Sequence, residues 1–264
     1  MNKSIKRIAP AMLVLIGLAT LSFTAKDGIT LKLQPQKGKT YTITTKNTSM
    51  NLMEVMGQTQ NQSQNMETRQ SFTVKETSAE QSVLETKIEA LKMNIGTGGM
   101  KLEYDSEHPE KTSPMLASQT AEMEKSLNKP VNITYDAQGK LVGEADLEMN
   151  QLSAAIISLP KDEVSVGSKW SDEKTQNLSG TEFTVNYEFT VTAISKKSVD
   201  ISYTGNVNSK DVSGKIEGTG SINPQTGILM KRNEKQNLSM TITQQGLSIP
   251  VTMAATTTVT VEEK

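Results

Sequence analysis

At residues 183–193 the chain reads FTVNYEFTVTA, with an apolar or aromatic side chain at every second position. Such alternation is typical of a β-strand that buries one face and exposes the other. The same period recurs at residues 199–203, 238–242 and 247–261, and in residues 29–33 and 41–43 on either side of a turn at Gly38. Several of these runs exceed the length of about five or six residues that is usual for strands, and long strands twist. We therefore predict a mainly β fold, whose long, antiparallel and strongly curved sheet forms an open barrel or half-barrel.

Two segments interrupt the alternation and predict short helices. The first covers about residues 113–129, where Ser113 can act as N-cap and Pro114 occupies the first helical position. The second covers about residues 144–159, with apolar residues at helical spacing and Pro160 as the stop. The periodicity of residues 82–95 fits either a helix or a strand.

A weak internal repeat resolves that ambiguity. Residues 37–41 (KGKTY) resemble residues 166–170 (VGSKW), and the tripeptide FTV at 72–74 recurs at 189–191. A Ser-Val pair follows each tripeptide and in the second copy opens an alternating strand, so we predict a strand over residues 83–93. Residues 133–142 and 222–230 both resemble hairpins that need glycine in the turn. The repeat predicts two related β-meander halves, about residues 29–142 and 164–264, within a single domain of residues 26–264.

The first 25 residues have the layout of an export signal. Lys3, Lys6 and Arg7 precede an apolar run over residues 8–23. We expect cleavage near residue 25 and a periplasmic or secreted protein with no stable membrane span. The alternative is an uncleaved segment that anchors the protein in the inner membrane, although the apolar run is shorter than the ~20 residues that a spanning helix needs.

Composition and charge exclude several functional classes. The whole chain has a net charge of −1. Removal of the signal takes away its three basic residues and makes the net charge more negative, which argues against nucleic acid as a partner. The chain has no cysteine, so disulfides, thiol catalysis and thiolate metal sites are absent. Aromatic residues make up only 4% of the sequence, so the core must rest on aliphatic side chains and methionine.

No arrangement of residues indicates catalysis. His108 is the only histidine, and we interpret it as an exposed loop residue because no nucleophile motif accompanies it. The carboxylates at 105–110, 162–163 and 172–173 lack the spacing of a calcium loop, and we interpret them as solvated charge. The glycines at 96–99 lack the lysine of a phosphate-binding loop and predict a hairpin turn instead. We therefore expect no enzyme activity, no metal site and no cofactor.

Methionine and amide residues supply further expectations. Met50 and Met53 lie three residues apart, so they would face opposite sides of a strand and could not jointly bind a soft metal. Adaptable packing is the better interpretation of the many methionines. Residues 57–65 are almost all Gly, Gln, Asn, Ser and Thr, which predicts a long exposed hairpin loop. Trp170 is expected to be a core anchor where the two halves meet.

The exported N-terminus, the VGSKW motif at 166–170, the YDS motif at 104–106 and the TGIL hairpin at 226–229 give the chain a family resemblance. It resembles an uncharacterised family of exported bacterial β-rich proteins, many of them lipoproteins, although this chain lacks the lipidated cysteine. The resemblance implies no activity and no catalytic residue. At the level of fold, long curved strands with helices on the concave side are similar to the lipoprotein-carrier half-barrels of the bacterial envelope.

Two functional hypotheses follow. In the first, the protein is a non-catalytic binding or carrier module that holds a lipid or another apolar small molecule on the concave face of its sheet, beneath the helices. In the second, it is a structural component of the cell envelope that binds a protein partner through an exposed edge strand or loop, with residues 256–258 and 57–65 as candidate surfaces. The ligand-binding candidates for the first hypothesis are Phe183, Val185, Tyr187, Phe189 and Val191 on a strand, with Met115, Met123 and Leu127 as a lid.

Overall fold

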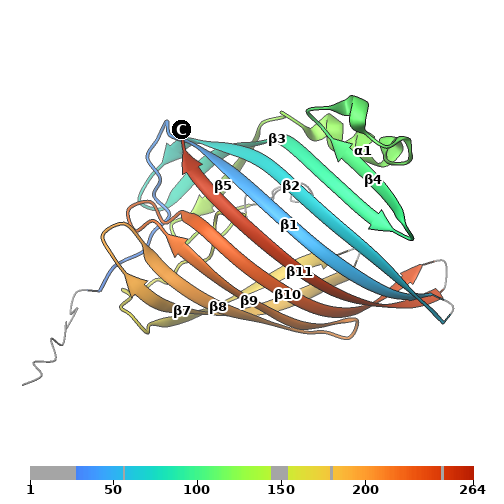
Figure 1. Cartoon of the computed structure of the whole chain (residues 1–264). Coiled ribbons are helices and arrows are strands. Elements are labelled where there is room, and N and C mark those ends of the chain that lie inside the picture. Colours follow the sequence, from blue (N-terminus) through green and yellow to red (C-terminus); the bar gives the residue numbers. More distant parts are fainter. Residues whose placement is uncertain (1–27, 56, 144–153, 179–180, 245–246) are drawn as a thin grey trace, which may run out of the picture.

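The computed structural model describes residues 28–55, 57–143, 154–178, 181–244 and 247–264. The expected export signal, residues 1–25, lies outside the described residues. Residues 144–153 of the second expected helix lie outside them as well. The described part of the chain is mainly β, as the alternation predicts (Figure 1). Its elements are β1 (Thr40–Val55), β2 (Gln58–Thr77), β3 (Gln81–Thr97), β4 (Met100–Asp105), η1 (Pro109–Lys111), α1 (Pro114–Ser126), β5 (Val131–Asp136), β6 (Lys169–Leu178), β7 (Thr181–Ile194), β8 (Val199–Asn208), β9 (Val212–Ile222), β10 (Leu229–Gln244) and β11 (Leu247–Glu263).

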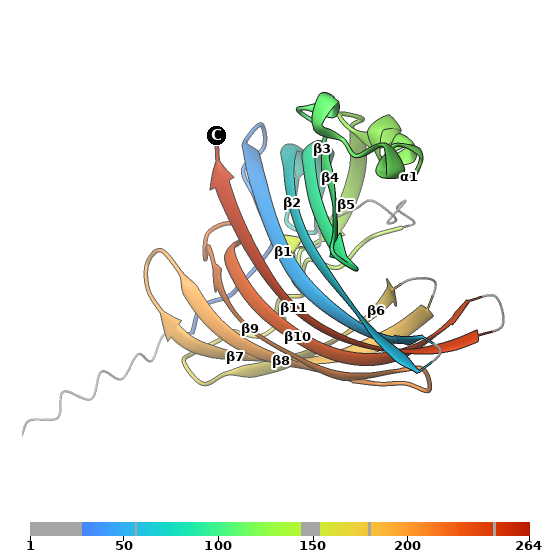
Figure 2. The same cartoon turned by 45° about the vertical axis from the view of Figure 1, so that its right-hand side comes forward.

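All these strands belong to one antiparallel sheet that is curved and does not close into a barrel (Figure 2). The strand order is β4-β3-β2-β1-β11-β10-β9-β8-β7-β6, and β5 pairs with the other half of β3. Strands β1 and β11 pair along most of their length, from Tyr41 opposite Glu263 to Met53 opposite Val251. The predicted half-barrel is therefore confirmed, and the first and last strands form its centre.

One face of this sheet is buried, and it is the inner face of the curve. Strand β8 alternates between buried and less buried positions along Val199, Ile201 and Tyr203, and β7 does the same from Phe183 to Val191. Antiparallel register carries the inner face across neighbouring strands, because directly paired residues point to the same side. For example, Trp170, Phe189 and Tyr203 form one inner row with Gly218 and Glu234.

The two meanders open with the same local geometry. Gly38 and Gly167 both adopt a positive φ, of 84° and 88°. The Gly38 N–H donates to Val74 O, and the Gly167 N–H donates to Val191 O, each at 2.9 Å. The aromatic residue that opens each strand then stacks on the phenylalanine of the next strand, Tyr41 on Phe72 and Trp170 on Phe189. The short sequence repeat thus corresponds to a repeated hydrogen-bond pattern.

Two extended segments pack against one end of the inner face and fill it. Residues 28–33 are not a ladder strand: Ile29 makes a single bridge to Val164, while Leu31 and Leu33 are fully buried. Both turn glycines that the hairpins require are closely approached here, because a Cβ at Gly139 would overlap with Ile157 O and one at Gly227 with Lys32 O. At this end the inner face of the sheet is therefore covered by other segments of the same chain.

The structure confirms one predicted helix and corrects the other. Helix α1 begins after Ser113, as predicted, with Pro114 in its first turn. The helix expected over residues 144–159 is wrong for its described end, because residues 156–160 are not helical. There the Leu159 N–H donates to Gln138 O at 2.8 Å, which ties this segment to the β5 hairpin instead of to its own previous turn.

Some of the other local predictions are confirmed and others are wrong. Residues 82–95 form a strand within β3, and Gly98 and Gly99 turn it into β4 with positive φ, as predicted. The exposed loop predicted for residues 57–65 is wrong, because β2 begins at Gln58 and pairs with β1 from Gln58 to Thr73. Trp170 opens β6 at the edge of the sheet, so the expectation that it lies where the halves meet is also wrong.

Candidate functional site

A charged cluster lies at the centre of the inner face. Arg232 and Glu234 are both inner-face residues of β10, two positions apart. The Glu234 carboxylate accepts hydrogen bonds from Arg232, from the Tyr203 hydroxyl at 2.8 Å and from Gln236 Nε2 at 2.7 Å. Arg232 Nε donates to the Tyr203 oxygen at 2.8 Å, and its guanidinium carbon lies 5.6 Å from the centre of the Tyr203 ring. Glu234 is only 3% exposed, so the ion pair is buried.

A glycine in β9, Gly218, leaves space for the Tyr203 ring of this cluster. Gly218 pairs with both Tyr203 and Glu234, and a Cβ at this position would overlap with the Tyr203 ring. The tyrosine therefore lies across the glycine, which brings its hydroxyl to the Glu234 carboxylate on the strand beyond. A glycine inside a strand commonly marks such a close approach.

Burial and charge shift the titration of the cluster in opposite directions. Burial alone would raise the pKa of Glu234, but the positive charge of Arg232 and three donated hydrogen bonds hold that pKa below its ordinary value. Burial raises the pKa of Tyr203, and the neighbouring Glu234 carboxylate raises it further against the opposing effect of Arg232. Burial would lower the pKa of Arg232, but Glu234 raises it. The cluster therefore holds a charged pair beside a neutral phenol.

A second cation faces the same region from the edge strand β6. Lys174 lies on the inner face of β6, opposite Val185, and burial followed by the charge of Arg232 lowers its pKa. The Arg232 charge lowers this pKa, whereas the charges of Asp172 and Glu234 raise it. Asp172, on the same face, accepts a hydrogen bond from Ser158 Oγ at 2.6 Å, and Ser158 O accepts one from Trp170 Nε1 at 2.9 Å.

Beyond Gln236 the inner face becomes apolar. Along β10 the inner positions change from Arg232, Glu234 and Gln236 to apolar side chains. Neighbouring strands β11 and β1 continue the apolar surface. The apolar strip, as we name it, consists of Met53, Leu238, Met240, Ile242, Ile249, Val251 and Met253. Met53, Ile242, Ile249 and Met253 are only partly buried, so the described residues do not cover the strip completely.

Helix α1 covers a separate part of the inner face, near the β3–β4 edge. Leu116 of α1 is 2% exposed and belongs to a small cluster with Leu91, Met93 and Tyr104. Met66 and Met123 pack against this cluster from its edge. Figure 2 shows α1 beside β4 and β5 and away from β7.

The structure splits the residues that the sequence suggested as one binding site. Phe183, Val185, Tyr187, Phe189 and Val191 lie together on the inner face and are at most 5% exposed in the large core. The suggested lid lies elsewhere: Met115 is 62% exposed, and Met123 packs on the α1 cluster. Leu127, at the C-cap of α1, is partly buried. The helix therefore does not close over β7, since its first turn directs Leu116, and not Met115, at the sheet.

Sequence reasoning missed Arg232, Glu234 and Lys174. Charged side chains at these positions break the apolar alternation, so the pattern around them resembles solvated polar sequence. The signal in the sequence was the alternation along the strand: Arg232 and Glu234 lie an even number of residues from Leu238 and Met240, so all four face the same side of β10.

Three buried oxygen atoms on the inner face of β1 and β2 lack a protein partner among the described residues. They are Thr68 Oγ1 and Gln70 Oε1 on β2 and Asn51 Oδ1 on β1. Gln70 does donate from Nε2 to Thr86 Oγ1 at 2.6 Å. Buried polar atoms are usually satisfied, so these positions can accept water or a ligand group.

A cleft of about 370 Å³ lies at the β6 edge. Its lining includes Lys140, Lys161, Glu163, Trp170 and Asp172. The mixed charges on its walls do not favour an apolar ligand. In the part of the chain that the structure describes, no group of His, Asp and Glu side chains is placed to hold a metal ion. Nor is any described helix long and apolar enough to cross a membrane.

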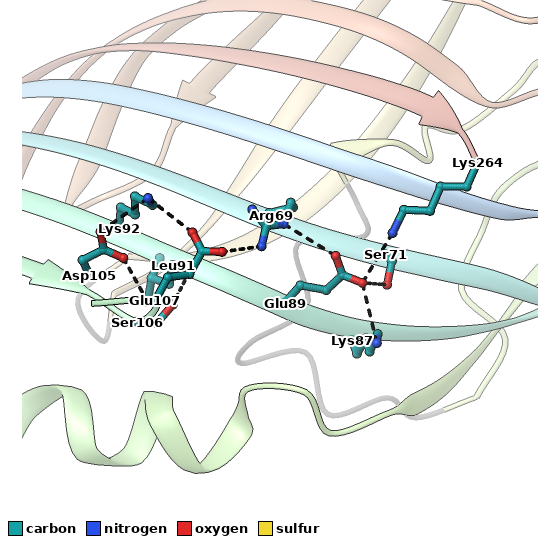
Figure 3. A network of polar contacts seen from close by, with 10 residues as sticks. All are labelled: Arg69, Ser71, Lys87, Glu89, Leu91, Lys92, Asp105, Ser106, Glu107 and Lys264. Carbon is teal, nitrogen blue, oxygen red and sulfur yellow. Dashed lines mark hydrogen bonds and ion pairs between the residues drawn. The ribbon is translucent and has the colours of Figure 1, made fainter. Parts of the chain in front are cut away.

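A network of ion pairs occupies the opposite, outer face of β2, β3 and β4 (Figure 3). Arg69 bonds Glu107 at 2.7 Å and approaches Glu89 at 3.6 Å, while Lys92 approaches Glu107 at 3.3 Å. The hydrogen bond from Arg69 holds the pKa of Glu107 below its ordinary value. Lys264 lies 3.7 Å from Glu89, which ties the end of the chain to β3. Because these groups are mostly exposed and mutually neutralised, we assign them a structural role.

The fold and the inner face define a mainly β protein with an open half-barrel sheet. The model of a family described as a family of unknown function (DUF6263) matches residues 143–248, which include β6 to β9 and the charged cluster. The resemblance to an uncharacterised family is thereby confirmed over these residues. No curated protein sequence matches the chain.

Two solved structures are similar to this chain at low scores. Lipovitellin, from a structure of its lipid–protein interactions, gives a TM-score of 0.48 at 10% identity, and the match covers 86% of this chain. The chain spans only 25% of lipovitellin. An outer membrane channel from Pseudomonas putida F1 gives a TM-score of 0.29 at 7% identity, covering 87% of this chain and 98% of the channel. Neither score carries an argument about function.

Proposed function

We propose that this protein is an exported, non-catalytic binding or carrier module that holds one lipid-like molecule on the inner face of its sheet. The observation that carries the proposal is the apolar strip. It lies on the inner face of the curved sheet (Figure 2), and several of its side chains stay partly exposed in the described structure. Exposed apolar surface that lies together in a concavity commonly marks a ligand site.

The side chains of the strip suit a flexible apolar ligand. Met53, Met240 and Met253 surround Val251, since Met53 and Met240 pair with it directly and Met253 lies two residues further along β11. Methionine is unbranched and polarizable, so it adapts to irregular apolar partners. This group of thioethers suits an alkyl chain better than it suits a rigid ring system.

The competing hypothesis of a protein partner keeps only part of its candidate surfaces. Residues 256–258 lie in β11, which pairs with β1 on one side and β10 on the other, so their backbone groups are engaged in the sheet. Residues 62–65 of β2 lie between β1 and β3 and are engaged in the same way. Residues 58–61 pair with β1 alone among the described strands, so a short edge remains there.

The test compares two methionines on one strand. Met53 points to the inner face of β1, whereas Met50 is 56% exposed on the outer face, as the three-residue spacing predicts. Binding of lauryl alcohol to the exported, delipidated protein is measured by isothermal titration calorimetry. Met53→Gln should weaken binding about fivefold, because a partial methionine contact is worth about 1 kcal/mol, whereas Met50→Gln should leave it unchanged.

Wild-type protein that binds no lauryl alcohol would contradict the proposal. Equal losses in the two variants would contradict it as well, because they would place the alcohol off the inner face. Intact mass spectrometry of the same exported preparation also shows whether the first 25 residues have been removed, which tests the export part of the proposal.

A further inference from the structure

We propose that the ligand is an anionic amphiphile, and that Lys174 and Arg232 on the inner face bind its acidic head group while the apolar strip holds its tail. This inference rests on the proposed function and names the ligand class for the same site. The commitment is to a lipid carboxylate and not to a free small anion.

The position of Lys174 supports the assignment. Its inner row continues through Val185, Val207 and Gly214 to Leu238, and Leu238 pairs with Met253. Lys174 therefore shares a row of the inner face with two members of the apolar strip. A chain lying along β10 and β11 would have its polar end at this row or at the charged cluster next to it.

The ammonium of Lys174 has no counterion in contact. The structure shows no hydrogen bond and no ion pair within 4.0 Å between Lys174 and any described residue. Asp172, the carboxylate two positions away on the same face of β6, accepts a hydrogen bond from Ser158. Burial and Arg232 lower the pKa of Lys174, and the charges of Asp172 and Glu234 offset only part of that effect. An anion that binds next to a lysine in this environment stabilises its charged form.

Arg232 supplies donors in the same region. A guanidinium carries five N–H groups, and the structure engages Nε with Tyr203 and one terminal nitrogen with Glu234. The Arg232 side chain is 17% exposed while that of Glu234 is 2% exposed, so the guanidinium lies nearer to the inner surface than its partner does. Arg232 is already paired with Glu234, whereas Lys174 makes no ion pair with a described residue, so Lys174 is the cation that an acidic head group would contact.

The functional test uses three ligands with the same alkyl chain: lauric acid, lauryl alcohol and laurylamine. Wild-type protein should bind lauric acid most tightly and laurylamine least. Lys174→Met should weaken lauric acid binding by about tenfold to a hundredfold, the range for loss of a charge-assisted contact, and should leave lauryl alcohol binding nearly unchanged. Lys169→Met is the matched control, since Lys169 lies on the same strand but is exposed and paired with Glu188.

The outcomes separate the two proposals. If no ligand binds, the proposed function itself is wrong. If lauric acid and lauryl alcohol bind equally, or if Lys174→Met and Lys169→Met behave alike, the ligand site stands and the head-group assignment is overturned. Sodium acetate serves as a tail-free anion, and binding of acetate as tight as that of lauric acid would also overturn the assignment.

Thermal unfolding of the variant distinguishes a binding role from a structural one. Lys174→Met removes a partly buried and unpaired charge, so its Tm should equal or exceed that of the wild type. A lysine that stabilised the fold would give the opposite result. A lowered Tm, together with equal losses of acid and alcohol binding, would show that the variant disturbs the sheet, and the assignment would then fail.

Discussion

Replacement of Glu234 by glutamine removes one charge from the centre of the inner face and leaves Arg232 buried without a counterion. Tyr203 and Arg232 donate to one carboxylate oxygen and Gln236 to the other, so the single amide oxygen of glutamine can replace only one of these acceptors. Breaking a buried ion pair costs about 3–5 kcal/mol, and because one acceptor survives we expect the lower end, about 3 kcal/mol. At roughly 2–4 °C per kcal/mol for a domain of this size, the Tm should fall by roughly 6–12 °C.

The assay is urea unfolding at neutral pH, followed by circular dichroism, with an exposed pair as the control. Glu188→Gln breaks the pair with Lys169, whose side chains are 55% and 61% exposed, and should cost less than about 0.5 kcal/mol. The double variant Arg232→Met/Glu234→Gln should recover much of the loss, because the orphaned charge is removed as well. A Glu234→Gln cost no larger than the control, or strictly additive costs in the double variant, would refute the reasoning.

The same variant predicts a pH dependence. The folded state holds the pKa of Glu234 below its ordinary value of 4.5, so the unfolded state binds the proton more readily. This stabilisation is fully present above that ordinary value and is lost as the pH falls through the lowered pKa. The difference in unfolding free energy between wild type and Glu234→Gln should therefore shrink below about pH 4.5. A difference that stays constant down to the acid transition would contradict the assigned pKa direction.

Two further substitutions test the packing. Trp170→Ala removes the stack on Phe189 and the hydrogen bond to Ser158 O, and should cost about 3 kcal/mol in urea unfolding, whereas an unchanged midpoint would show that the ring only covers the surface. Leu116→Ala should cost about 2–3 kcal/mol because Leu116 is buried against β3 and β4, while the neighbouring Met115→Ala should change stability by less than about 0.5 kcal/mol; the reverse order would mean that α1 packs through its other face.

Strand identity was predictable where apolar alternation was strong. Residues 183–193 and 199–203 have one fully apolar face, so their inner side chains could be named from the sequence. The assignment of residues 83–93 needed the repeat, because their apolar spacing also fits a helix. The pairing of β1 with β11 joins Tyr41 to Glu263, and no local pattern encodes a contact of such sequence separation.

Failures occurred where polar residues form regular structure. Residues 58–65 carry no apolar signal, yet β1 supplies backbone partners for all of them and β3 for residues 62–65, and side-chain bonds such as Thr48 to Asn65 at 2.9 Å add to them. In the candidate site the difficulty was similar. Arg232, Glu234 and Lys174 are polar residues on a buried face, and the bonds that join Arg232 and Glu234 to Tyr203 on β8 cross strands, where no local pattern encodes them.

The most direct test of the central claim is photo-crosslinking of the wild-type protein with a fatty acid that carries a diazirine in its alkyl chain. Peptide mass spectrometry then identifies the labelled residues. The account predicts labels on inner-face residues of β1, β10 and β11, above all Met53, Met240 and Met253, that excess lauric acid suppresses. Labels confined to outer-face residues such as Met50, or labels that lauric acid does not displace, would contradict it.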